Sequence, residues 1–119
     1  MEIMTIAQEI RSKIKEIDSI RASIKERGIQ KARTISEYEK ALAVTIIKLK
    51  NGVEFVFEGE IISKPPVTIL EKIARGICWK EKQSAEEAEA LYKSATSNMQ
   101  AVLAQLNADQ SLFSKLDKG

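Results

Sequence analysis

The sequence predicts a mainly α-helical protein, built as a long antiparallel helical hairpin of coiled-coil type with a small β-hairpin and a short helix at its tip. Two apolar stripes with helical spacing, one near each end of the 119-residue chain, predict the two long helices. A short β-branched and aromatic stretch between them predicts the strands. We expect a single domain, 1–119, and a homodimer or higher oligomer, because two helices alone form a thin layer that leaves much surface exposed.

The first apolar stripe predicts a long helix over residues 1–50. This segment contains no proline and a single glycine, Gly28. Between Ile24 and Ile35 the stripe steps by 11 residues across that glycine. Either the helix bends at Gly28 or two helices meet there. We expect Asn51-Gly52 to end the element, because glycine adopts the left-handed conformation that closes helices.

A β-hairpin is predicted over residues 53–62, turning at Glu58-Gly59, because apolar and acidic residues alternate there. An isolated hairpin is marginal in water, so it either packs on the helices or extends a sheet across a dimer. A short helix should follow over residues 68–75. It would begin with a capping box from Thr68 to Glu71.

The second apolar stripe predicts a long helix over residues 77–117. A start near Ile77 is favoured over a start at Ala85, because no helix-breaking residue lies between them. Closure of the hairpin between Lys50 and Ile77 would place Asp109 opposite Asp18, within reach of basic side chains. Alternatively, the stripe has opened into water by Asp109, which leaves that carboxylate solvated.

The two stripes supply the residues expected to form the oligomer seam. The N-terminal helix can pair within its own chain or swap into a neighbour, and both arrangements remain open. Opposite net charges, +4 for residues 1–50 and −2 for residues 84–119, favour packing of one arm on the other. The predicted seam residues are Ile3, Ile10, Ile17, Ile24, Ala88, Tyr92, Ala95, Met99, Val102, Leu106 and Phe113.

The composition argues against an enzyme. The chain has no histidine, so it lacks the usual acid–base group and the usual metal ligand, and we assign no catalytic residue, metal site or cofactor. Cys78 is the only cysteine, which excludes an intramolecular disulfide and fits a reducing compartment. No stretch approaches the roughly 20 apolar residues of a membrane span. We expect a cytoplasmic protein that does not enter membranes.

Residues 65–83 are the richest candidate for a ligand site. Arginine next to a flat aromatic side chain is a common way to hold phosphates and nucleobases. The favoured interpretation is nevertheless that the apolar residues of this segment cap the bundle while its cations stay solvated. Binding of nucleic acid by this segment or by charge alone has weak support. The candidate ligand residues are Arg75, Trp79, Lys82, Lys72 and Thr68.

From about residue 38 onward, over some two thirds of the chain, the sequence resembles a family of small, uncharacterised helical proteins of tailed phages and prophages of Gram-positive bacteria. The first 35 residues do not match this pattern distinctly. The resemblance implies a phage accessory protein made in the host bacterial cytoplasm, and it implies no catalytic residues. It rests on Tyr38-x-x-Ala41-Leu42-Ala43, Pro65-Pro66-Val67-Thr68, Glu71-Lys72-Ile73-Ala74-Arg75-Gly76, Cys78-Trp79, Ala88-Glu89-Ala90-x-Tyr92 and Leu106 to Leu116.

Two functions follow as hypotheses. The first is a non-enzymatic, oligomeric phage protein that counters a host defence, either by sequestering a nucleotide immune signal or by binding a defence protein. The second is a coiled-coil structural or adaptor protein in phage DNA replication, recombination or particle assembly. A steep salt dependence of DNA binding would favour the second hypothesis, because contacts to phosphates release counterions.

Overall fold

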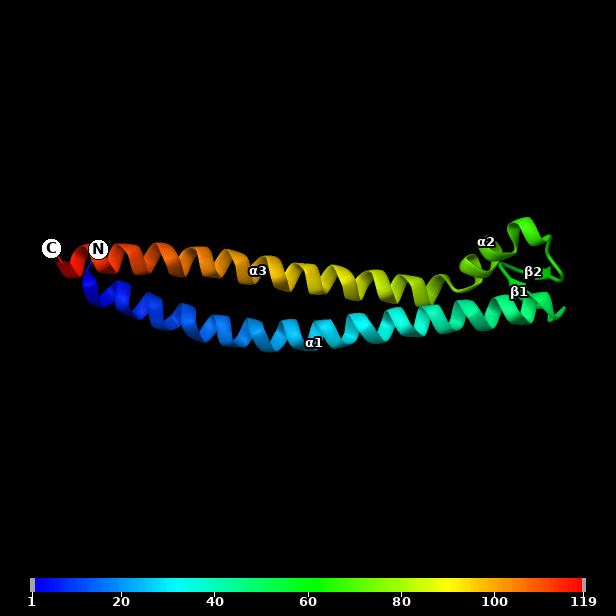
Figure 1. Cartoon of the computed structure of the whole chain (residues 1–119), viewed down its shortest axis with the longest axis horizontal. Helices are drawn as coiled ribbons and strands as arrows, with labels where there is room; N and C mark the ends of the chain where they lie inside the picture. Colours follow the sequence, from blue (N-terminus) through cyan, green and yellow to red (C-terminus); the bar gives the residue numbers. More distant parts are fainter. Residues whose placement is uncertain (1, 119) are drawn as a thin grey trace. The chain divides into compact units, whose positions relative to one another are not determined.

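A computed structural model describes residues 2–118 and contains three helices and a two-stranded sheet (Figure 1). No helix within these residues is both long enough and apolar enough to cross a membrane. The elements in chain order are α1 (Ile3–Lys50), β1 (Phe55–Phe57), β2 (Glu60–Ile62), α2 (Val67–Ile77) and α3 (Trp79–Lys118). The predicted class is therefore confirmed: a helical hairpin with a small β-hairpin and a short helix between its long helices.

The chain divides into two compact units. Unit 1 combines the residues up to Ile29 with those from Ala90 onward, and unit 2 consists of Gln30–Glu89. In Figure 1, unit 1 contains the blue part of α1 and the orange and red part of α3, which lie side by side. Unit 2 contains both strands, α2 and the remaining parts of the two long helices.

The core of unit 1 is a single layer between two antiparallel helices. Ile17 and Ile20 of α1 are buried against Val102 of α3. Half-buried side chains of Ile24, Met99 and Leu106 pack around these three. The N-terminal helix therefore packs against α3 of its own chain in this structure.

The core of unit 2 brings three kinds of element together. Leu49 of α1 is buried against Leu70 and Ala74 of α2. Phe55 and Ile62, one from each strand, pack against the same cluster. Of the two predicted arrangements for the β-hairpin, the structure contains the one in which it packs on the helices.

Helix α1 runs from Ile3 to Lys50 without a break at Gly28. Gly52, two residues after the helix, has φ +79°. The Gly52 N–H donates to the Leu49 carbonyl at 3.2 Å, and the Val53 N–H donates to the Lys48 carbonyl at 3.0 Å. This hydrogen-bond pair is the Schellman motif, so glycine closes the helix as the sequence predicts.

The helices after the strands differ from the predicted ones at their ends. Helix α2 begins at Val67, its N-cap is Pro66, and no side chain caps it, so the predicted capping box at Thr68 is wrong. Proline in the turn before the helix fixes the chain direction without a side-chain cap. Gly76 lies inside α2, and the break falls at Cys78, whose N–H donates to the Ala74 carbonyl at 3.0 Å.

The predicted position of Asp109 opposite Asp18 is also wrong. Asp109 lines a hollow of about 350 Å³ with Glu9, Ser12, Lys13 and Gln105, about two turns of α1 before Asp18. Lys13 Nζ donates to Gln105 Oε1 at 2.6 Å, in the same register. The prediction placed the closure of the hairpin at the last residue of α1, whereas α2 packs beside the final turns of that helix and moves the closure back along it.

Candidate functional site

The β-hairpin of unit 2 turns through the two residues Glu58 and Gly59, with φ +51° and +77°. Positive φ at both central residues is typical of the type I′ turn, whose twist matches that of the flanking strands. This turn sets the register, in which Val56 lies opposite Ile61. The pair is therefore one residue beyond the pair that flanks the turn.

The two faces of this hairpin differ in burial although each carries a pair of apolar side chains. Phe55 and Ile62 face the helical core and are half-buried. Val56 and Ile61 point the other way, and their exposed fractions are 76% and 68%. Two β-branched side chains thus stand next to each other on a face that no described residue covers.

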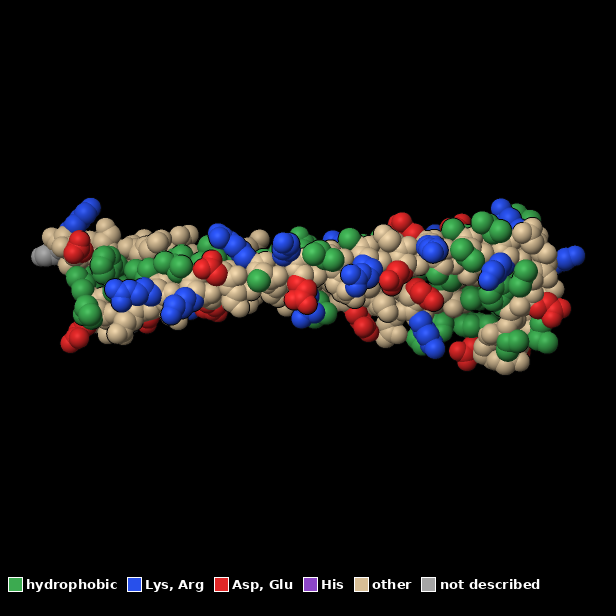
Figure 2. Space-filling model, turned by 90° about the horizontal axis from the view of Figure 1, so that it is seen from below, with side chains coloured by type: hydrophobic (Ala, Val, Ile, Leu, Met, Phe, Trp, Pro, Cys, Tyr) green, Lys and Arg blue, Asp and Glu red, His purple; other side chains and the backbone are tan. Residues whose placement is uncertain are grey.

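Helix α2 adds further exposed apolar side chains to unit 2. Val67, its first residue, is 86% exposed, and Ile69 is 44% exposed. Val67 also lines a hollow of about 410 Å³ with Ile46, Lys50, Leu70 and Glu71. In Figure 2, green hydrophobic side chains reach the surface where the strands and α2 lie, with charged side chains around them.

Three of the five candidate ligand residues lie together. Thr68, Lys72 and Arg75 line one hollow of about 400 Å³ on α2, together with Glu71. The Nη2 of Arg75 donates to Glu71 Oε1 at 2.7 Å, so the guanidinium of the hollow already has a carboxylate partner. An incoming phosphate would have to compete with this carboxylate for the guanidinium.

The other two candidate ligand residues lie outside that hollow. Trp79 begins α3, is 46% exposed, and has Lys80 Nζ 5.6 Å from its ring centroid. Lys82 lies one turn further along, with its Nζ 3.9 Å from Glu86 Oε1. The predicted combination of an arginine with the indole is therefore not assembled around one hollow.

The predicted seam residues of unit 1 pack within the chain. Ile17, Ile24, Met99, Val102 and Leu106 belong to one cluster. Ile3 and Ala95 are half-buried, and the Tyr92 ring lies over Gly28, where an added Cβ would be 3.5 Å from Cε2. Ala88, in unit 2, is buried.

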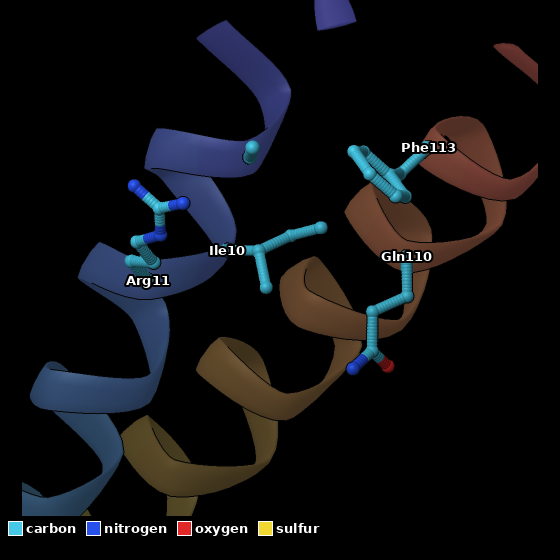
Figure 3. Close-up of a pocket in the computed structure, with 5 residues that line it drawn as sticks. Ile10, Arg11, Gln110 and Phe113 are labelled. Carbon is cyan, nitrogen blue, oxygen red and sulfur yellow. The ribbon is translucent and has the colours of Figure 1, made fainter. Parts of the chain in front are cut away.

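The last two seam residues, Ile10 and Phe113, line an apolar hollow of about 440 Å³ in unit 1 with Ala7, Arg11 and Gln110. Figure 3 shows Ile10 and Phe113 pointing into the space between α1 and α3, whereas Arg11 extends along the outer side of α1. Both apolar side chains are only half-buried. The hollow is thus an open, mainly apolar notch in the helical layer.

Cys78 is buried beside Thr45, with its Sγ 3.3 Å from Thr45 Oγ1. Within residues 2–118 there is no group of three or more His, Cys, Asp and Glu side chains placed to hold a metal ion. The thiol therefore belongs to the packing of unit 2.

Sequence reasoning missed the exposed apolar pair on the β-hairpin. In the alternation that predicts the hairpin, Val53, Phe55 and Phe57 are the apolar residues and Glu54 and Glu58 are the acidic ones. Val56 stands where this alternation would place an acidic residue and so breaks it. A two-residue turn at Glu58-Gly59 also places Val56 opposite Ile61, so the pair could have been predicted from the turn and the spacing.

The chain matches no family model, no curated protein and no solved structure.

Proposed function

We propose that this chain is a non-enzymatic phage accessory protein that counters a host defence by binding a defence protein in the host cytoplasm. The phage assignment rests on the sequence resemblance. Binding to a protein rests on the exposed apolar surface of unit 2. Val56, Ile61 and Val67 are 76%, 68% and 86% exposed, although each would be favourably buried against a partner.

The β-hairpin is the strongest support for a protein partner. Its inner face packs on the helices through Phe55 and Ile62, so that face is already covered within the fold. The outer pair contributes little to this core and presents apolar area to solvent. Exposed apolar area with charged residues around it is typical of protein–protein interaction sites.

The test is phage plating on defence-positive bacteria with and without expression of the protein. We expect expression to raise plating efficiency, and we expect the double variant Val56→Ser, Ile61→Ser to lose this benefit. Val44→Ser is the matched control, because Val44 is an exposed valine of α1. An equal benefit from the double variant and the wild type, at equal helicity and protein level, would contradict the proposal.

Sequestration of a nucleotide signal is the second candidate, favoured by the hollow that gathers Thr68, Lys72 and Arg75. Native mass spectrometry of protein from infected, defence-positive cells, before and after heat release, tests it. A stoichiometric nucleotide that is lost in Arg75→Ala but retained in Trp79→Ala would support the α2 hollow as its site. Protein free of small ligands would count against sequestration.

A further inference from the structure

We propose that the β1 edge of the hairpin is a strand-addition site for an extended partner segment that carries an apolar residue with a lysine or arginine two positions to either side. This inference rests on the proposed function as a protein-binding protein and names the chemistry of the partner. It follows from the backbone groups, the side chains and the charges of residues 53–63.

The backbone of Val56 is free to pair with another strand. A type I′ turn closes with a hydrogen bond between its flanking residues, here Phe57 and Glu60. Antiparallel pairs alternate between hydrogen-bonded and non-hydrogen-bonded, so Val56 and Ile61 form a non-hydrogen-bonded pair. Their N–H and C=O groups point outward, and within residues 2–118 neither residue has a further backbone partner.

The side chains along β1 select the partner. Glu54 directly precedes β1 and Glu58 directly follows it in the turn, so an acidic residue stands at each end of the strand, on either side of Val56. All three are exposed. Val56 would pack beside an apolar residue of an added strand, and each glutamate would face a cation.

A second copy of the chain does not fit this edge. Residues 53–63 contain three glutamates and no lysine or arginine. Antiparallel pairing of two β1 strands about Val56 would bring Glu54, before the strand of each copy, toward Glu58, in the turn of the other. Like charges directly opposite each other destabilise a strand pair, so the charges favour a basic partner over self-pairing.

The experiment is an NMR titration of the isotope-labelled full chain with the end-blocked peptide TKTVTKT and with its acidic twin TETVTET. We expect saturable shifts centred on β1 with the basic peptide only, and slower hydrogen exchange at the Val56 amide. The Ile61 amide, on the opposite edge, should keep its exchange rate. The assay contains no host factor, so its result is independent of the plating experiment.

The double variant Glu54→Lys, Glu58→Lys should weaken binding of the basic peptide by about tenfold and should bind the acidic twin instead. Glu37→Lys, Glu39→Lys makes the same charge change at exposed positions of α1 and should leave binding unchanged. The proposal would be overturned by absence of binding, by equal binding to both charge variants, or by dimers linked through β1. Helicity equal to that of the wild type ensures that a lost interaction is not lost folding.

Discussion

The two units of this chain differ in how many elements surround a buried side chain. In unit 1, Ile17 and Ile20 meet α3 alone, and the side chains packed around them are only half-buried. In unit 2, Leu49 lies in a cluster with residues of α2 and of both strands, and it is 1% exposed. A pair of helices can bury single side chains, such as Ile6 at 0% exposed, whereas further elements add apolar surface on more sides of a cluster and so bury a larger fraction of it.

Leu49→Ala should have the largest effect, because Leu49 is the largest fully buried side chain of unit 2. We expect a loss of about 3 kcal/mol in the free energy of unfolding, since the surrounding elements hold the resulting cavity open. Urea denaturation followed by circular dichroism measures it. A loss below that of Ile17→Ala would reverse the proposed ranking of the two cores.

Ile17→Ala should cost less, about 2 kcal/mol, because the two-helix layer of unit 1 can close over the gap or admit water. Hydrogen exchange should show faster opening of amides near Ile17 and Val102. Amides around Leu70 provide the internal reference, since they belong to the other core. Equal acceleration in both units would mean that they unfold as one and that the distinction in packing has no energetic meaning.

Gly59→Ala should destabilise unit 2 by about 1 kcal/mol. Gly59 has φ +77° with open space around it, so the whole effect comes from the left-handed backbone and none from a clash. Thermal unfolding with a matched Gly76→Ala variant measures it, because Gly76 also has open space but lies inside α2. A neutral Gly59→Ala variant would show that the turn is not held in the type I′ form.

Gly28→Ala should have the smallest effect and the opposite sign. Gly28 is helical, and an added Cβ would lie at an ordinary contact distance of 3.5 Å from the Tyr92 ring. We expect stabilisation by up to about 1 kcal/mol from helix propensity. A loss of stability in urea denaturation would indicate that Tyr92 cannot accept the methyl group.

The sequence was sufficient for what depends on periodicity and local turn chemistry. The stripes of α1 and α3, the glycine closure at Gly52 and the turn at Glu58-Gly59 all follow from residue type and spacing. The register of the long helices was not predictable, because it depends on α2 packing beside the last turns of α1. Asp109 shows this error in register, because it lies beside Glu9 and Lys13 and not opposite Asp18.

The candidate ligand site was also predictable only in part from the sequence. Thr68, Lys72 and Arg75 recur at helical spacing, and the structure gathers them in one hollow. Trp79 and Lys82 were grouped with them by proximity in sequence, but the break at Cys78 begins a new helix with its own direction. Val56 and Ile61 are exposed because the opposite face of the hairpin packs on the cluster that contains Leu49 and Leu70. Those two residues come from distant segments of the sequence, so the buried face could not be predicted locally.

The buried contact between Cys78 and Thr45 makes the rate of thiol labelling a measure of how often unit 2 opens. Cys78 is its only thiol and is 2% exposed, so a thiol reagent reacts only when α2, α3 and α1 separate around it. The rate at which one label attaches to each molecule therefore reports how often unit 2 opens. Any molecule that binds unit 2 and holds it closed would slow that attachment, so a partner can be recognised by chemical timing without being labelled itself.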